Sequence, residues 1–242
     1  MHINTWEYTF PPSTGVMVSE LVIKAKLKVT LMFKSSKRLG HIPYAVFVKI
    51  LDCQIVPRVL YAAEIWGLKE VPEIEKVHVL ALEKKKKYLN VFSKTPNMMV
   101  YGENGCYPLF VLTAVKAVKY WFKVVTMYQE RYTRKAYNML VYTDSTGKEN
   151  WATWLRTCLC LRGFSHARLH QGTGDTGRVI SDLKAKLIEM SAQTWQANLH
   201  SSNRSDVYKR QFYLFSWHSN SVIPNLKRQY TSLSYFCPRT PK

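Results

Sequence analysis

Hydrophobic residues recur at helical spacing along most of the chain. Over residues 18–39 they fall on one arc at about 100° per residue, which predicts an amphipathic helix. The positions expected to face the core are Val22, Ala25, Val29, Met32, Phe33 and Ser36. The opposite arc carries the basic residues Lys24, Lys28, Lys34 and Arg38. We therefore expect a helix with an apolar inner side and a basic outer side.

Prolines mark the boundaries of the next helices. Pro43 suits the first turn of a helix that Pro57 kinks or ends, and a short apolar helix or turn follows to Gly67. A third helix should begin near Pro72. Its apolar side is expected to hold Ile74, Val77, His78, Ala81 and Leu82. Its end carries the lysine run 84–87, where cations meet the negative end of the helix dipole.

Thr, Pro, Asn and Gly dominate residues 93–106, which predicts a linker. Beyond it, helical patterns cover 109–127, 130–142, 149–162 and 178–199, and strand-like alternation is scarce apart from residues 6–10. The fold class predicted is all-α. A helical thumb-like bundle over 17–92 would be followed by a second helical unit over 107–200.

The charge balance narrows the function. The 242 residues include 35 Lys and Arg against 16 Asp and Glu, a formal charge of +19, which favours a polyanionic partner such as nucleic acid. No stretch of apolar residues is long enough for a membrane span. The five scattered cysteines favour a reducing intracellular compartment, the nucleus or the cytoplasm.

Two apparent binding motifs are rejected. Residues 172–177 match G-x-G-x-x-G, but no strand precedes them, so we interpret them as a loop before a helix capped by Asp175 or Thr176. Cys158 and Cys160 stand near His166 and His170, yet a helix would point the two cysteines about 200° apart. We expect no metal site and no cofactor in this chain.

The chain also offers no catalytic centre. Two-metal phosphoryl transfer needs clustered carboxylates, and no two aspartates are adjacent. What remains are basic surfaces with aromatic residues between them. The first basic surface is the helix of residues 18–39, and the second is the run that includes Lys84 and Lys85. The third is a cluster of Lys116, Lys119, Lys123, Arg131, Arg134 and Lys135, near the aromatic residues Tyr120, Trp121, Tyr128 and Tyr132. Lysines contact phosphates as point charges, which sets affinity rather than sequence choice.

Residues 43–67 contain a distinctive set of residues in one order, Asp52, Pro57, Leu60, Tyr61, Glu64, Trp66 and Gly67. This segment resembles the one that follows the palm in the LINE-type (non-LTR) retrotransposon reverse transcriptases. Four further segments resemble later motifs of the family, in the same order: residues 95–105, Asn150 with Trp151, Gly163 with Phe164, and residues 171–175. Residues 6–8 stand where the family has a primer-grip motif, although its Leu-Gly is missing here.

The resemblance implies a C-terminal part of an RNA-directed DNA polymerase. Residues 1–16 would be a palm or primer-grip remnant, 17–92 the thumb, 93–106 the linker and 107–200 the post-polymerase helical region. The catalytic palm, with its Asp pair and its Mg²⁺, would lie upstream, so the chain alone should be inactive. Residues 206–211 are also encoded by a transposon end used in sequencing libraries, and we expect 201–242 to be a disordered or foreign tail.

The resulting hypothesis is a sequence-independent grip on RNA or on an RNA–DNA or DNA duplex, next to the missing palm. The phosphate contacts expected are Lys24, Lys28, Lys34, Arg38, Lys84 and Lys85. Two alternatives stay open. One is a stand-alone basic helical interaction protein with an acidic partner, and the other is a non-functional retroelement relic.

Overall fold

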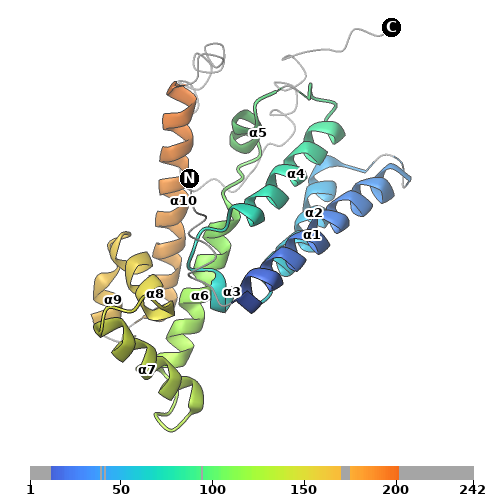
Figure 1. The fold of residues 1–242 in the computed structure, drawn as a ribbon. Helices are drawn as coiled ribbons and strands as arrows, with labels where there is room; N and C mark the ends of the chain where they lie inside the picture. The colour runs from blue at the N-terminus through green and yellow to red at the C-terminus, as the bar shows by residue number, and fades with distance from the viewer. Residues whose placement is uncertain (1–11, 39, 41, 94, 170–174, 202–242) are drawn as a thin grey trace, which may run out of the picture.

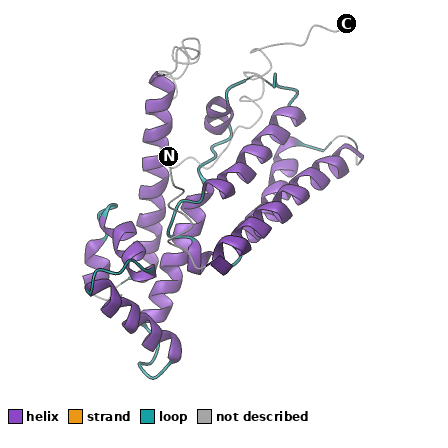
Figure 2. Cartoon of the chain, in the orientation of Figure 1, coloured by secondary structure: helices purple, strands orange, loops and turns teal. Residues whose placement is uncertain are grey.

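The computed structural model describes residues 12–38, 40, 42–93, 95–169 and 175–201. All regular elements among them are helices, so the predicted all-α class is confirmed (Figure 2). The helices are α1 (Pro12–Arg38), α2 (Tyr44–Val59), α3 (Ala63–Trp66), α4 (Pro72–Tyr88), α5 (Asn97–Glu103), α6 (Leu109–Val125), α7 (Tyr132–Ser145), α8 (Trp151–Cys160), α9 (Ser165–Leu169) and α10 (Thr176–Ser201).

Helices α1, α2 and α4 pack side by side around one hydrophobic core (Figure 1). The six inner positions predicted for the first helix are all buried, with exposed fractions between 0% and 9%. The five inner positions predicted for α4 are buried as well. At the centre Phe47 stacks on Tyr88 with 4.1 Å between ring centroids, and Phe33 meets Phe47 edge-on. Helical periodicity therefore located this core from the sequence.

A second core surrounds α6, which lies between α10 and the first group of helices (Figure 1). Trp121 of α6 is fully buried, and its indole N–H donates a hydrogen bond to the Tyr137 hydroxyl on α7, 2.9 Å away. Leu155 of α8 and Leu183 of α10 close the same core. An indole buried this deeply is stabilised only when its N–H finds a partner, and Tyr137 supplies one.

Helix α3 joins the two cores by a close approach to α6. Gly67, directly after α3, lies so near α6 that a Cβ atom there would be 2.7 Å from the Thr113 carbonyl oxygen. The Glu64 carboxylate forms an ion pair with Lys116 of α6, with 3.1 Å between Oε1 and Nζ. The Glu64 carbonyl oxygen accepts a hydrogen bond from the Trp151 indole N–H at 3.0 Å. Residues far apart in sequence thus fix the relative positions of α3, α6 and α8.

Asp144, at the end of α7, holds α7, α8 and α9 together. Its carboxylate accepts hydrogen bonds from Arg156 at 2.9 and 3.1 Å and from the Thr153 hydroxyl at 2.7 Å, and Arg168 lies 3.5 Å away. The hydrogen bonds from Arg156 are the main reason that the pKa of Asp144 lies below its usual range. Asn150 begins α8 with a capping box that it shares with Thr153.

The structure differs from the sequence prediction at several boundaries. The segment expected to be a linker contains α5, whose first residue follows Pro96. Helix α1 begins at Pro12, so residues 12–16, which we had assigned to a palm remnant, are helical. Helix α9 was not predicted. The expected strand-like segment 6–10 and the expected tail, apart from Ser201, lie outside the described residues.

The interpretation of the glycine motif at 172–177 as a loop and helix cap finds support in its described part. The Asp175 carboxylate accepts a hydrogen bond from the Arg178 backbone N–H at 3.0 Å, which caps the first turn of α10. Cys158 is buried and Cys160 exposed, as expected for two residues on opposite sides of a helix. His170 lies outside the described residues.

Candidate nucleic-acid interface

The outer side of α1 carries the four basic residues singled out from the sequence. Lys24, Lys34 and Arg38 are exposed, and Lys28 is half-buried. Lys24 forms a surface ion pair with Glu20, one turn away, at 3.2 Å. Among the described residues, Lys28, Lys34 and Arg38 form no ion pair. Three of these four cations are therefore available to an external anion without breaking an internal contact.

The same side of α1 also exposes an apolar stripe, which the sequence analysis did not anticipate. Ile23, Leu27 and Leu31 follow one another at four-residue spacing, and Ile23 and Leu27 are 65% and 59% exposed. Val16 continues the stripe toward the start of the helix. The outer side is therefore mixed, with apolar residues between the basic ones, and is not the uniformly basic surface that we expected.

The lysine run 84–87 is divided between surface and interior. Lys84 is half-buried, with its ammonium 5.5 Å from the centre of the Phe33 ring. Lys85 is only 2% exposed, and its Nζ lies 3.5 Å from Cys106 Sγ and 3.9 Å from an Asp52 carboxylate oxygen. A lysine held in this way does not reach a phosphate at the surface. We therefore remove Lys85 from the interface proposed from the sequence.

Lys86, next to Lys85, is buried as well, and the burial of neither lysine was predicted from the sequence. The Lys86 ammonium donates hydrogen bonds to the Thr95 carbonyl oxygen and, at 2.6 Å, to the Asn97 side chain. Burial lowers the pKa of Lys86, although the neighbouring Glu83 carboxylate opposes that shift. The role of Lys86 in this structure is to tie the segment before α5 to α4.

The cluster at 116–135 contains both surface and internal cations. Lys116 bonds Glu64, and Arg134 is buried, whereas the remaining members, Lys119, Lys123, Arg131 and Lys135, are exposed. Tyr128 and Tyr132, at the turn between α6 and α7, are 86% and 91% exposed. Exposed aromatic rings beside cations are the combination on which unpaired bases stack.

No group of three or more His, Cys, Asp or Glu side chains suited to a metal ion occurs among the described residues. Of the four described aspartates, Asp52, Asp144 and Asp182 lie on three different helices, α2, α7 and α10, and Asp175 directly precedes α10. None of the helices described is long and apolar enough to cross a membrane.

Comparisons with known proteins found no relative. The chain matches no protein-family model, no curated protein and no solved structure.

Proposed function

We propose that the protein binds nucleic acid without regard to sequence and that the outer side of α1 contacts the phosphate backbone. The observation that carries this proposal is the disposition of Lys24, Lys28, Lys34 and Arg38 on the side of α1 opposite its buried arc. The formal charge of +19 supports it, because so strong an excess draws polyanions from a distance. The partner is an RNA or an RNA–DNA or DNA duplex.

The short motifs shared with LINE-type reverse transcriptases support a narrower form of the proposal. In that form the chain is the thumb and post-polymerase part of such an enzyme, works in the nucleus or cytoplasm and grips the template–primer duplex beside a separate palm. The proposal gives this chain no catalytic role. Purified protein is expected to extend no primer on an RNA template with Mg²⁺ or Mn²⁺, because the chain has no adjacent aspartates to hold two metal ions.

A matched pair of variants tests the proposed interface. In the α1 variant, Lys24, Lys28, Lys34 and Arg38 are changed to Gln. In the control variant the exposed cations of the second cluster, Lys119, Lys123, Arg131 and Lys135, are changed to Gln. Each variant loses four formal positive charges, so a non-specific loss of net charge affects both equally. Circular dichroism checks that both keep their helix content.

Fluorescence anisotropy with a labelled duplex of about 20 base pairs and mixed sequence measures the affinity at about 0.1 M salt. The α1 variant should bind more than about tenfold more weakly than the wild type, since each lost phosphate contact also gives up counterion release. The control variant should lose less. Equal losses in the two variants would mean that net charge alone attracts the duplex, and the assignment of the interface to α1 would be wrong.

The apolar stripe on α1 favours a second candidate function, the binding of a partner protein. A helix with an apolar seam and acidic flanks would cover Ile23, Leu27 and Leu31 and pair with the flanking cations. Changing Ile23 and Leu27 to Gln separates the two functions. Duplex affinity should remain within about twofold of wild type if phosphates are the ligand, because neutral side chains release no counterions.

A further inference from the structure

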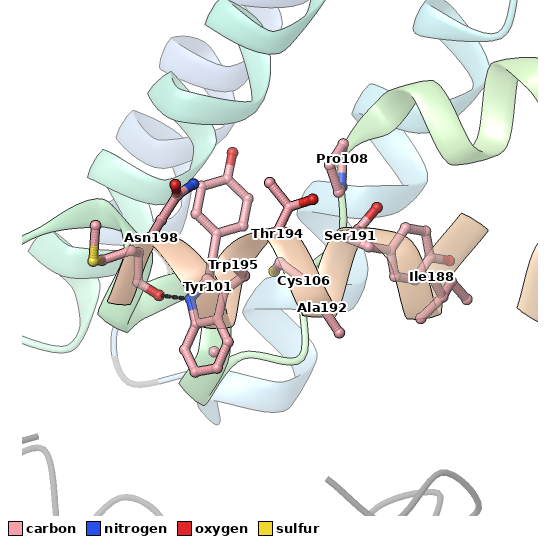
Figure 3. A pocket seen from close by; sticks show the side chains of 12 residues that line it. Tyr101, Cys106, Pro108, Ile188, Ser191, Ala192, Thr194, Trp195 and Asn198 are labelled. Atoms are coloured by element: carbon pink, nitrogen blue, oxygen red, sulfur yellow. Dashed lines mark hydrogen bonds between the residues drawn. The ribbon is translucent and has the colours of Figure 1, made fainter. Parts of the chain in front are cut away.

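A pocket of about 280 Å³ lies between α10 and the segment that runs from α5 to the start of α6. Its walls are largely aromatic and aliphatic, with Tyr101 and Tyr107 on one side and Ile188 and Trp195 of α10 on the other. The Trp195 indole N–H donates to the Met98 carbonyl oxygen at 2.6 Å, which holds the ring in place (Figure 3). Cys106 stands among these side chains (Figure 3).

Two buried nitrogen bases on α4 flank the Cys106 thiol. Lys85 Nζ lies 3.5 Å from Sγ, and the His78 side chain lies close enough to the same thiol to lower its pKa. Lys85 and His78 are both buried, and the His78 ring also meets the Tyr101 ring edge-on at 4.9 Å. Cationic forms of these two side chains would stabilise a thiolate, which the apolar pocket alone would disfavour.

Two carboxylates, those of Glu75 and Asp52, lie beside the bases His78 and Lys85. Glu75 lies 3.6 Å from His78 Nδ1, and Asp52 of α2 lies 3.9 Å from Lys85 Nζ. The described side chains that α10 contributes to the pocket are Ser191, Thr194, Asn198 and apolar residues, none of them charged. The charges that act on the sulfur are therefore those of His78 and Lys85, and Glu75 and Asp52 lie beside these two side chains.

The pKa values shift in the directions that this arrangement requires. Burial alone would raise the pKa of Cys106, but His78 and Lys85 outweigh it, and the thiol pKa lies below its ordinary value. Burial would likewise lower the pKa of His78, and contacts with Cys106 and Glu75 reverse the effect and raise it. Cys158 is also buried, and burial raises the pKa of its thiol although the Arg162 guanidinium opposes that shift.

We propose that Cys106 is a modification site, a nucleophilic thiolate that adds to a small electrophile of the α,β-unsaturated carbonyl class whose apolar body occupies the pocket. The sulfur forms a bond with the β-carbon, and the carbon–carbon π bond breaks. Its electron pair moves toward the carbonyl as an enolate, whose α-carbon takes a proton from water. No oxidant and no leaving group are required. This site is separate from the basic side of α1 and does not depend on the proposed function.

N-Ethylmaleimide serves as the probe, and mass spectrometry of peptides reports the modification of each cysteine in the same sample. The exposed residues Cys53 and Cys160 are internal references. At about pH 6 an ordinary thiol is almost entirely protonated, and each unit by which the pKa is lowered gives about tenfold more thiolate. Cys106 should therefore react several-fold faster than either reference at that pH. A rate equal to or below that of Cys53 would overturn the proposal.

Variants separate the electrostatic part of the site from the pocket. Lys85→Met and His78→Gln should each slow the reaction of Cys106 at about pH 6 toward the Cys53 rate while leaving Cys53 unchanged. Ala192→Trp fills the pocket and should slow Cys106 at every pH. Gln193→Trp, on an exposed position of the same helix, is the matched control and should not. If Ala192→Trp leaves the rate unchanged, the pocket does not admit the electrophile. Should a variant unfold, the comparison within the wild-type protein still decides the proposal.

Discussion

Gly67→Ala should destabilise the protein more than any ordinary surface glycine substitution, because backbone encloses this position on both sides. An added Cβ atom would lie 2.4 Å from the Ala63 carbonyl oxygen, 2.7 Å from the Thr113 carbonyl oxygen and 2.9 Å from the Thr113 carbonyl carbon. Gly67 has a φ of −73°, which any residue adopts, so the cost is steric and does not arise from the backbone conformation.

The expected magnitude follows from these distances. Ordinary contact for a Cβ atom begins near 3.4 Å, so α3 and α6 would have to separate by several tenths of an ångström to relieve the contacts with Thr113, and the end of α3 would have to distort to relieve the contact with Ala63. Overpacking of a core typically costs about 1–3 kcal/mol, and backbone atoms, unlike side-chain ends, cannot rotate away, so we expect about 3 kcal/mol. For a protein of this size that corresponds to a fall in Tm of roughly 6–12 °C, measured by circular dichroism at 222 nm.

Gly177→Ala is the control. Gly177 lies in the first turn of α10, where, among the described residues, an added Cβ atom would meet only the Asp175 side chain, at 3.2 Å. Replacing a helical glycine by alanine favours the helix by about 0.5–1 kcal/mol, so this variant should melt at the same temperature as the wild type or slightly higher. A Gly67→Ala protein that melts within about 2 °C of the wild type would show that α3 and α6 do not approach as described.

Three further predictions concern single contacts. Asp144→Asn should make the stability of the protein less dependent on pH in the acid range. The pKa of this carboxyl is lowered in the folded state, so the stability it contributes is present above about pH 4, the unfolded value, and is lost as the pH falls through the folded value. Urea titrations at several pH values measure this loss. Asn150→Ala should cost about 1 kcal/mol, seen in the same titrations at neutral pH, because it removes the cap of α8. Changing Tyr128 and Tyr132 together to Ala should weaken the binding of single-stranded RNA by about 1–3 kcal/mol for each stacked base with an unchanged Tm, whereas unchanged anisotropy titrations would exclude base stacking at these rings.

The inner sides of α1 and α4 could be predicted from the sequence because helical periodicity decides which residues face the core. The same rule, applied to single lysines, places Lys85 on the inner side of α4 but leaves Lys86 outside it, and Lys86 is buried because Thr95 and Asn97 bind its ammonium. We had treated the lysine run as one block at the end of a helix, and a block has no inner side. A full turn of lysines at the boundary of a core must place some of its members inward, where they need partners.

The Cys106 site could not be predicted from spacing. His78 and Lys85 come together with Cys106 only because α5 and its flanking segments fold back onto α4, a contact that Lys86 and Asn97 secure. Residues 93–106 contain Pro and Gly, a composition that predicts a linker, so the seven-residue helix α5 within them was not predicted. The exposed stripe of Ile23 and Leu27 was missed for a different reason. Apolar residues stand on both sides of the helix, and the larger apolar arc alone predicts the buried side.

The salt dependence of duplex binding is the sharpest test of whether the outer side of α1 contacts phosphates. Each phosphate contact contributes about 0.9 to the slope of log K against log salt, so four contacts made by Lys24, Lys28, Lys34 and Arg38 account for up to roughly 3.6 units. The account predicts that the variant with these four residues changed to Gln has a slope shallower by up to that amount, while the control variant of the second cluster keeps a slope closer to that of the wild type. An unaltered slope in the α1 variant would contradict the account, because it would mean that these cations release no counterions when the duplex binds.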